Sequence, residues 1–323
     1  MEKTMKMIFG RLGKIKKQKL ADILYAIFRF VILISVGYII LYPLLYMIIT
    51  SFRTTASYLD PTRQWIIKDL SLEHFKRAIE FLNYGKSFLL TIRTEMVSAL
   101  LEIASCAVAA YGFARFKFKF KNFFTAVLFL TILVPAPMII IPLVTNFAKT
   151  DFLGVLGLLY KLTGVDLRIN LVGTVFTFYL PSLLGVGLRS GILIFIYIQF
   201  FKGLPKELEE AAMIDGAGPI KSFLKIAVPS SGVVIITVTV FSLVWHWNDY
   251  TLASMYMPGN RTLAVSIFDY PSILTSQGYY TNVPETKGYM LAGCVLFVMP
   301  MLILYLILQR GFIESIDRVG ITG

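Results

Sequence analysis

Charged residues are scarce in this chain of 323 residues. Asp, Glu, Lys and Arg make up 15% of the sequence, whereas a soluble domain contains about 25%. Hydrophobic residues make up 57%, which excludes an ordinary water-soluble globule. An apolar segment of about 20 residues crosses a bilayer as a helix, so the composition predicts an all-α polytopic membrane protein.

Cysteine and the common catalytic motifs are also nearly absent. Cys106 and Cys294 both lie in apolar runs, which excludes a disulfide framework and a metal site with CxxC spacing. The sequence has no GxxxxGKS/T phosphate loop and no HExxH zinc motif, and its intramembrane polar residues include no nucleophile beside a base. We therefore predict that the chain is not an enzyme and has no catalytic residue, no metal site and no cofactor of its own.

Acidic residues are outnumbered by basic ones, which gives a net charge of +12. In a membrane protein the basic residues collect on the cytoplasmic flanks of the spans, so this charge does not indicate nucleic acid binding. With six spans and a cytoplasmic N-terminus, the inner segments carry Lys and Arg at about twice the density of the outer ones. Both termini are therefore predicted to be cytoplasmic, with a basic leader at 1–22, a transmembrane domain at 23–310 and a tail at 311–323.

Five apolar runs are predicted to span the membrane: 30–50, 88–113, 123–147, 232–247 and 288–309. A sixth stretch, 171–201, would measure about 46 Å as one helix, which exceeds the apolar core of a bilayer. Pro181, Gly185 and Gly187 lie in its middle, where they would unwind a helix. The stretch is either two spans or one broken span. Two spans would place the basic loop 202–231 outside, so we predict one discontinuous crossing.

The loop 202–231 has the pattern of a short helical elbow. Pro205 suits a first helical position, and the acidic residues that follow complement the positive end of a helix dipole. Gly216 is predicted to end this helix, and Pro219 opens a second one. The elbow is amphipathic and has one face of small residues, so another protein can approach its backbone closely.

Residues within this elbow carry a family resemblance. Glu210-Ala211-Ala212, Asp215-Gly216-Ala217, Phe223, Ile226 and Pro229 resemble the EAA loop of permeases of binding-protein-dependent ATP-binding-cassette importers. The stretches 110–116, 247–250, 309–314 and 320–323 are similar to carbohydrate-importer permeases of the maltose-transporter type, so the resemblance covers most of the chain. One departure is Val233, where that family commonly has a second proline.

The resemblance implies a type I importer permease in the prokaryotic cell membrane. Its implied partners are a second homologous permease, two cytoplasmic ATPase subunits that bind ATP and Mg, and an extracellular solute-binding protein that delivers a sugar or oligosaccharide. The residues implied to couple to the ATPase are Glu210, Ala211, Ala212, Asp215, Gly216, Ala217 and Phe223. A permease for a peptide or amino acid is an alternative. A secondary transporter is a weaker one, because it would not need the elbow.

Six polar or aromatic residues at membrane depth are candidates for lining a solute path: Glu102, Arg189, Trp247, Asn248, Asp249 and Tyr250. A charge inside a bilayer is costly and faces either a partner side chain or a wet cavity. Glu95 precedes Glu102 by seven residues and lies on nearly the same helical face. Pairing with another helix and lining the path both remain open for these charges. The aromatic residues could stack on sugar rings or form an interfacial belt, and His246 is expected to pack.

The topology can be tested with single cysteines in intact cells. Cysteines at Lys119 and Lys206 should be protected from an impermeant thiol reagent, because both positions are predicted to be cytoplasmic, whereas one at Asp60 should be labelled. Labelling of the Lys206 position from outside would instead support two spans within 171–201.

Overall fold

The computed structural model of the chain describes residues 2–54, 57, 69–151, 154–187, 189–280 and 283–320. Every regular element within these ranges is a helix, and the only β pairing there consists of two isolated bridges. The predicted all-α class is therefore confirmed. The topology marker Asp60 and the last three residues of the predicted tail lie outside the described residues.

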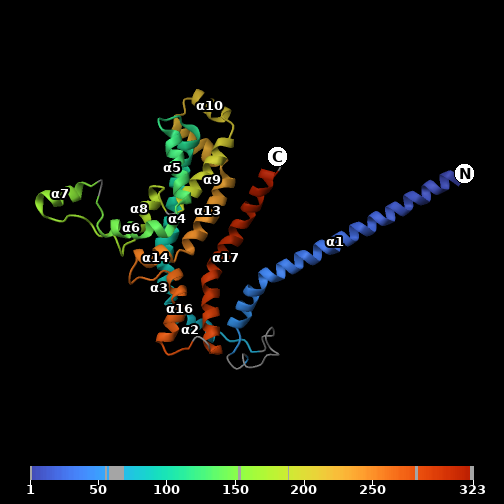
Figure 1. Cartoon of the computed structure of the whole chain (residues 1–323), viewed down its shortest axis with the longest axis horizontal. Coiled ribbons are helices and arrows are strands. Elements are labelled where there is room, and N and C mark those ends of the chain that lie inside the picture. The colour runs from blue at the N-terminus through green and yellow to red at the C-terminus, as the bar shows by residue number, and fades with distance from the viewer. Residues whose placement is uncertain are drawn as a thin grey trace.

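Within the described residues, three helices are long and apolar enough to cross a membrane. They are the apolar part of α1 (Glu2–Ser51), the continuous helix formed by α3 (Tyr84–Thr91), η3 (Ile92–Met96) and α4 (Val97–Arg115), and α17 (Pro284–Gly320). They correspond to the predicted runs 30–50, 88–113 and 288–309. The C-terminal end of α1 packs against α17, whereas the N-terminal part of α1 extends away from the bundle (Figure 1).

Two further segments are bent rather than straight. The run 123–147 was predicted as one span with kinks, but it forms α5 (Lys121–Leu133) and α6 (Ala136–Ala148), which lie at 103° to each other. The predicted break at a proline is present, because Pro135, which has no N–H to donate, separates the two helices. The bend is sharper than a kink, and the pair fits either one broken span or a re-entrant loop. Helix α13 (Gly232–Trp247) matches the predicted run 232–247 and is preceded by a bend of 81°.

The fourth predicted crossing is broken, as expected. Helix α8 (Phe176–Leu183) and helix α9 (Ser190–Gly203) are separated by a short non-helical stretch. Gly185 within this stretch has a φ of +66°, a left-handed conformation that glycine adopts without strain. Both α8 and α9 pack against α4, so the break lies beside the middle of the long helix.

The main core lies where α4, α9 and α13 meet. Fully buried members include Ala110, Leu193, Tyr197 and Val238. A second cluster joins α2 (Glu73–Phe81), α16 (Tyr270–Ser276) and α17 at the opposite end of the bundle from α10 (Glu207–Ile214) (Figure 1).

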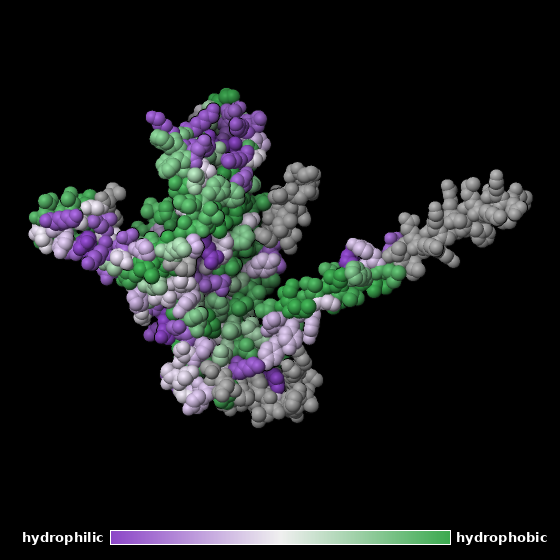
Figure 2. Space-filling model, in the orientation of Figure 1, coloured by the Kyte–Doolittle hydropathy of each residue, from purple (hydrophilic) through white to green (hydrophobic). Residues whose placement is uncertain are grey.

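The surface around the bundle agrees with a membrane environment. Figure 2 shows hydrophobic surface on the upper body of the bundle and along the described part of α1. Hydrophilic residues gather at the end that carries α10, and others lie on the arm that carries α7 and toward the opposite end. None of the most apolar window of Asp22–Ser51 is buried within this chain. A helix that is apolar and uncovered all round needs lipid or another protein around it.

Candidate functional site

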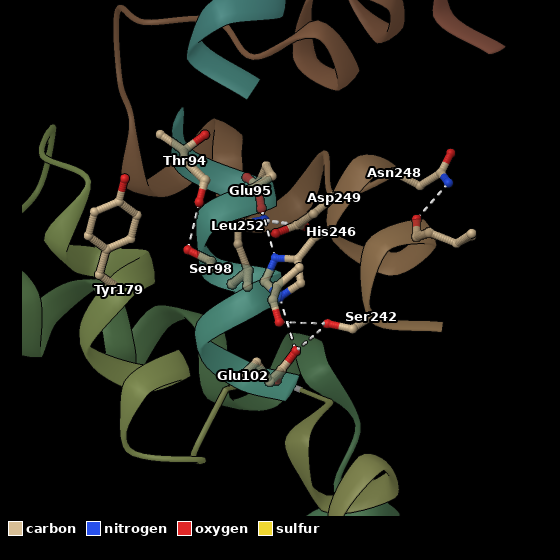
Figure 3. A network of polar contacts seen from close by, with 12 residues as sticks. Thr94, Glu95, Ser98, Glu102, Tyr179, Ser242, His246, Asn248, Asp249 and Leu252 are labelled. Atoms are coloured by element: carbon tan, nitrogen blue, oxygen red, sulfur yellow. Dashed lines mark hydrogen bonds and ion pairs between the residues drawn. The ribbon is translucent and has the colours of Figure 1, made fainter. Parts of the chain in front are cut away.

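Two buried carboxylates share one histidine at the centre of the bundle. His246 of α13 places Nδ1 3.0 Å from Glu95 Oε2 and Nε2 3.0 Å from Glu102 Oε2. Glu95 and Glu102 are 1% and 2% exposed and lie on one face of the same helix, as Figure 3 shows. The predicted shared face is confirmed, and so is pairing with another helix. The expectation that His246 merely packs is wrong.

The histidine bridge sets a condition on protons. Both ring nitrogens of His246 donate at once only when the ring is doubly protonated; otherwise one carboxyl group must donate to the ring. Either arrangement leaves fewer net negative charges in the bundle than two isolated carboxylates would. The sequence did not indicate this pairing, because His246 lies 144 residues from Glu102. The available signal was that two glutamates on one face of a membrane helix require a partner side chain, which does not identify the partner.

Glu102 also holds the break between α8 and α9. The hydroxyl of Ser190, the first residue of α9, donates to Glu102 Oε1 at 2.5 Å, and the hydroxyl of Ser242 donates to Oε2 at 3.2 Å. A Cβ atom at Gly187 would lie 2.6 Å from Glu102 Oε1. The glycine therefore allows the non-helical stretch to approach the carboxylate closely, a role separate from the left-handed turn at Gly185.

A polar cavity of about 230 Å³ lies beside this cluster. Its lining includes Glu102, Arg189, Trp245, His246, Asn248 and Asp249. The guanidinium of Arg189 lies 4.9 Å from the centre of the Trp245 ring. The structure thus brings four of the six predicted path residues together around one cavity. An adjoining apolar cavity of about 680 Å³, bordered by Gly185, Gly187 and Gly191, also reaches His246.

The other two predicted path residues do not line either of these cavities. Trp247 is 2% exposed, its indole N–H donates to the carbonyl of Phe297 at 3.1 Å, and its ring packs near Phe88. The ring of Tyr250 is stacked on Phe268. The buried Trp247 ring does not face a cavity in this conformation, and one face of the half-buried Tyr250 ring is covered by Phe268. Stacking of these rings on a sugar stays a prediction. Trp245 is the aromatic residue at the cavity, although the prediction chose its neighbour.

The elbow forms with small differences from the prediction. Helix α10 begins at Glu207, so Pro205 precedes it instead of occupying its first position, and it ends at Ile214. Gly216, two residues beyond the end, has a φ of +78°, and the N–H of Ala217 donates to the carbonyl of Ala212 at 2.9 Å. Pro219 begins α11 (Pro219–Ser222). Glu210, Ala211, Asp215 and Gly216 are exposed, whereas Ala212, Ala217 and Phe223 are half-buried.

The tip of the elbow also exposes large apolar side chains. Ile214 and Ile220 are 86% and 76% exposed, and Leu208, Met213 and Leu224 are exposed as well. All of these except Met213 have a charged neighbour along the chain, so apolar and charged side chains are mixed on this surface. Such a mixed surface is typical of contacts between proteins.

The chain is similar in sequence to known membrane transport proteins. The profile of the family described as "Binding-protein-dependent transport system inner membrane component" matches residues 104–318, about two thirds of the chain. The chain is 28% identical over 276 residues to a probable permease protein of a starch degradation products transport system from Thermoanaerobacterium thermosulfurigenes, which covers 85% of this chain and 89% of that protein. It is 26% identical over 283 residues to a melibiose/raffinose/stachyose import permease of Bacillus subtilis strain 168, with 87% and 91% covered.

A solved structure has a similar fold. A chain of a bacterial ABC transporter involved in the import of the acidic polysaccharide alginate aligns with a TM-score of 0.68 and 18% sequence identity. The alignment covers 90% of the present chain and 97% of the other. The helix arrangement is therefore shared over nearly the whole length of both chains.

We expect His246→Ala to destabilise the protein strongly, because it leaves two buried carboxylates without their partner. Removing one partner of a buried ion pair costs about 3–5 kcal/mol. The measurement is the thermal unfolding midpoint of the purified protein in detergent. Asn248→Ala, at an exposed position two residues further on, is the matched control and should leave the midpoint nearly unchanged. Equal midpoints for the two variants would show that the bridge contributes little.

Proposed function

Because this chain belongs to the family of binding-protein-dependent transport system inner membrane components, we propose that it is the permease subunit of an ATP-driven importer of a sugar or oligosaccharide. Members of this family are transport components rather than enzymes, and the long apolar helices are those of a multi-pass membrane protein. The sugar assignment is supported by the relatives whose names refer to starch degradation products and to melibiose, raffinose and stachyose.

The observation that carries the ATP-driven part is the elbow. Helix α10 lies at the end of the bundle, and Ile214 and Ile220 are exposed next to the charged residues Asp215 and Lys221. We propose that the elbow seats against a cytoplasmic ATPase subunit through Glu210, Ala211, Ala212, Asp215, Gly216, Ala217 and Phe223. Two such ATPase subunits bind ATP and Mg and supply the hydrolysis that this chain lacks.

The remaining partners follow from the same proposal. A second homologous permease completes the pathway, and an extracellular solute-binding protein delivers the solute. The complex lies in a prokaryotic cell membrane with both termini of this chain inside. The described C-terminal end of α17 extends toward the half of the molecule that carries α10 (Figure 1), which supports placing the tail and the elbow on one side.

The polar cavity is our proposed segment of the solute path. Arg189, Asn248 and Asp249 border it with groups that can exchange hydrogen bonds with sugar hydroxyls. Glu102 also lines the cavity, and the Trp245 ring supplies an apolar face. Non-helical backbone at membrane depth persists where protein or a water-filled cavity satisfies it. The break at Gly185 and Gly187 borders the adjoining apolar cavity, which meets the polar cavity at His246.

The proposed function is tested by expressing the chain together with a candidate ATPase, second permease and solute-binding protein from the same organism. The complex is purified through a tag on this chain and placed in proteoliposomes. We expect the ATPase to copurify and sugar uptake to require both ATP and the binding protein. Uptake driven by an ion gradient without ATP would favour a secondary transporter, and a binding protein specific for a peptide or amino acid would overturn the sugar assignment.

Gly216→Val should reduce uptake by the complex at least tenfold. A side chain at a left-handed φ of +78° costs about 1–2 kcal/mol, and α10 can no longer end where it does. Gly203→Ala is the control, because a Cβ atom there meets nothing within 4 Å and the backbone is helical. Normal uptake by an assembled Gly216→Val complex would contradict the coupling role of this segment.

Arg189→Gln and Asn248→Ala should lower uptake or shift its selectivity while assembly and ATP hydrolysis survive. Both side chains border the polar cavity but neither belongs to the histidine bridge. Initial uptake rates at several sugar concentrations separate a change in KM from a change in maximal rate. Full uptake with unchanged KM in both variants would remove the cavity from the path.

A further inference from the structure

Helix α10 is attached to the bundle by one buried side chain. Among the residues of α10, only Glu209 is buried, and it points inward from a helix whose other side chains face outward or partly so. Its carboxylate Oε1 lies 3.0 Å from Nε of Arg115, the last residue of α4, and the two side chains are 9% and 7% exposed. The sequence suggested only that Glu209 would complement a helix dipole, so this ion pair is a finding of the structure.

Arg115 binds the elbow at a second point. Its Nη2 donates to the carbonyl of Leu204 at 2.9 Å, within the extended link that joins α9 to α10. One guanidinium therefore holds both the helix and the link that leads into it. One turn earlier in α4, the ring of Tyr111 packs against Phe223 with ring centres 4.9 Å apart. The C-terminal end of α4 therefore contacts the elbow at Leu204, Glu209 and Phe223.

The same helix is held at a second position by the polar cluster. Glu102 precedes Arg115 by 13 residues, which is about 20 Å along an α-helix. It binds Ser190 at the start of α9 and His246 of α13. Helix α4 therefore connects, without a break, the contact with α10 and the contact with the broken crossing. A displacement of one contact along the helix axis must be passed to the other, because the helix between them is continuous.

We propose that the Arg115–Glu209 ion pair is the link through which movement of α10 is transmitted to α4, and so to the break between α8 and α9. Arg115 and Glu209 are positioning residues: they touch neither the solute nor the nucleotide. The inference rests on the proposed function, since it assumes that an ATPase moves α10. Without the pair, the elbow remains joined to the bundle by the chain and by ring packing, and its movement is no longer imposed on α4.

The test compares four variants in the reconstituted importer: Glu209→Gln, Arg115→Gln, the double variant and Glu207→Gln. Glu207 is an exposed acidic residue of the same helix and serves as the matched control. The quantity measured is the number of ATP molecules hydrolysed per solute imported. We expect each single variant to raise this ratio at least tenfold, with ATP hydrolysis within about twofold of the unmodified complex, whereas Glu207→Gln should not change it.

The double variant addresses stability, because it leaves no unpaired buried charge. We expect its ratio to equal that of the single variants, since the link is already lost when either partner is removed. An assembled complex that retains the unmodified ratio in Glu209→Gln or in the double variant would overturn the proposal. Loss of assembly in all three would also overturn it, because the pair would then be a contact required for folding.

These outcomes are distinct from failure of the proposed function. All ratios are measured against an unmodified complex that is first shown to import a sugar with ATP. If that complex does not form, the permease assignment itself is wrong, whereas a working complex with insensitive variants refutes only the role of the ion pair.

Discussion

A carboxylate inside an apolar bundle must be given partners, and much of the central architecture follows from how Glu102 obtains them. Its two oxygens are bound by Ser190, Ser242 and His246, which come from two different helices. The contact with Ser190 places the start of α9 against α4, and Gly187 is small enough to let the non-helical stretch approach. The break in the fourth crossing is therefore held in place by hydrogen bonds to the carboxylate as well as permitted by glycine.

The sequence predicts correctly those elements that are determined by nearby residues in the chain. The limits of α13, the break in 171–201 and the turn at Gly216 all depend on proline, glycine or the length of an apolar run, and these are visible in the chain. The sharp bend at Pro135 was underestimated because helix direction after a proline depends on what the second half packs against. The partners of buried charges were missed for a related reason: His246 and Glu209 meet residues more than 90 positions away.

Which of two nearby tryptophans faces the cavity could not be predicted from the sequence either. Trp245 and Trp247 are indistinguishable by composition, and the prediction chose Trp247. In a helix, residues two positions apart point about 200° from each other, so at most one of them faces the cavity. Packing of Trp247 against Phe88 and Phe297 decides which. No property of the local sequence contains that information, because it lies in the helices on either side.

Exposed apolar side chains have different meanings in different parts of this molecule. Along α1 they are continuous and uncharged over 30–50, which is the surface that lipid or a neighbouring span would cover. On the elbow they alternate with Glu210, Asp215 and Lys221 at the hydrophilic end of the bundle. Acidic side chains are repelled by anionic lipid headgroups, so a lipid surface is a poor partner for the elbow. A protein surface with its own apolar pocket and complementary charges fits that pattern better. The buried Arg115–Glu209 ion pair lies behind the elbow and connects α10 to α4, so a force that such a protein exerts on α10 reaches α4 through this contact.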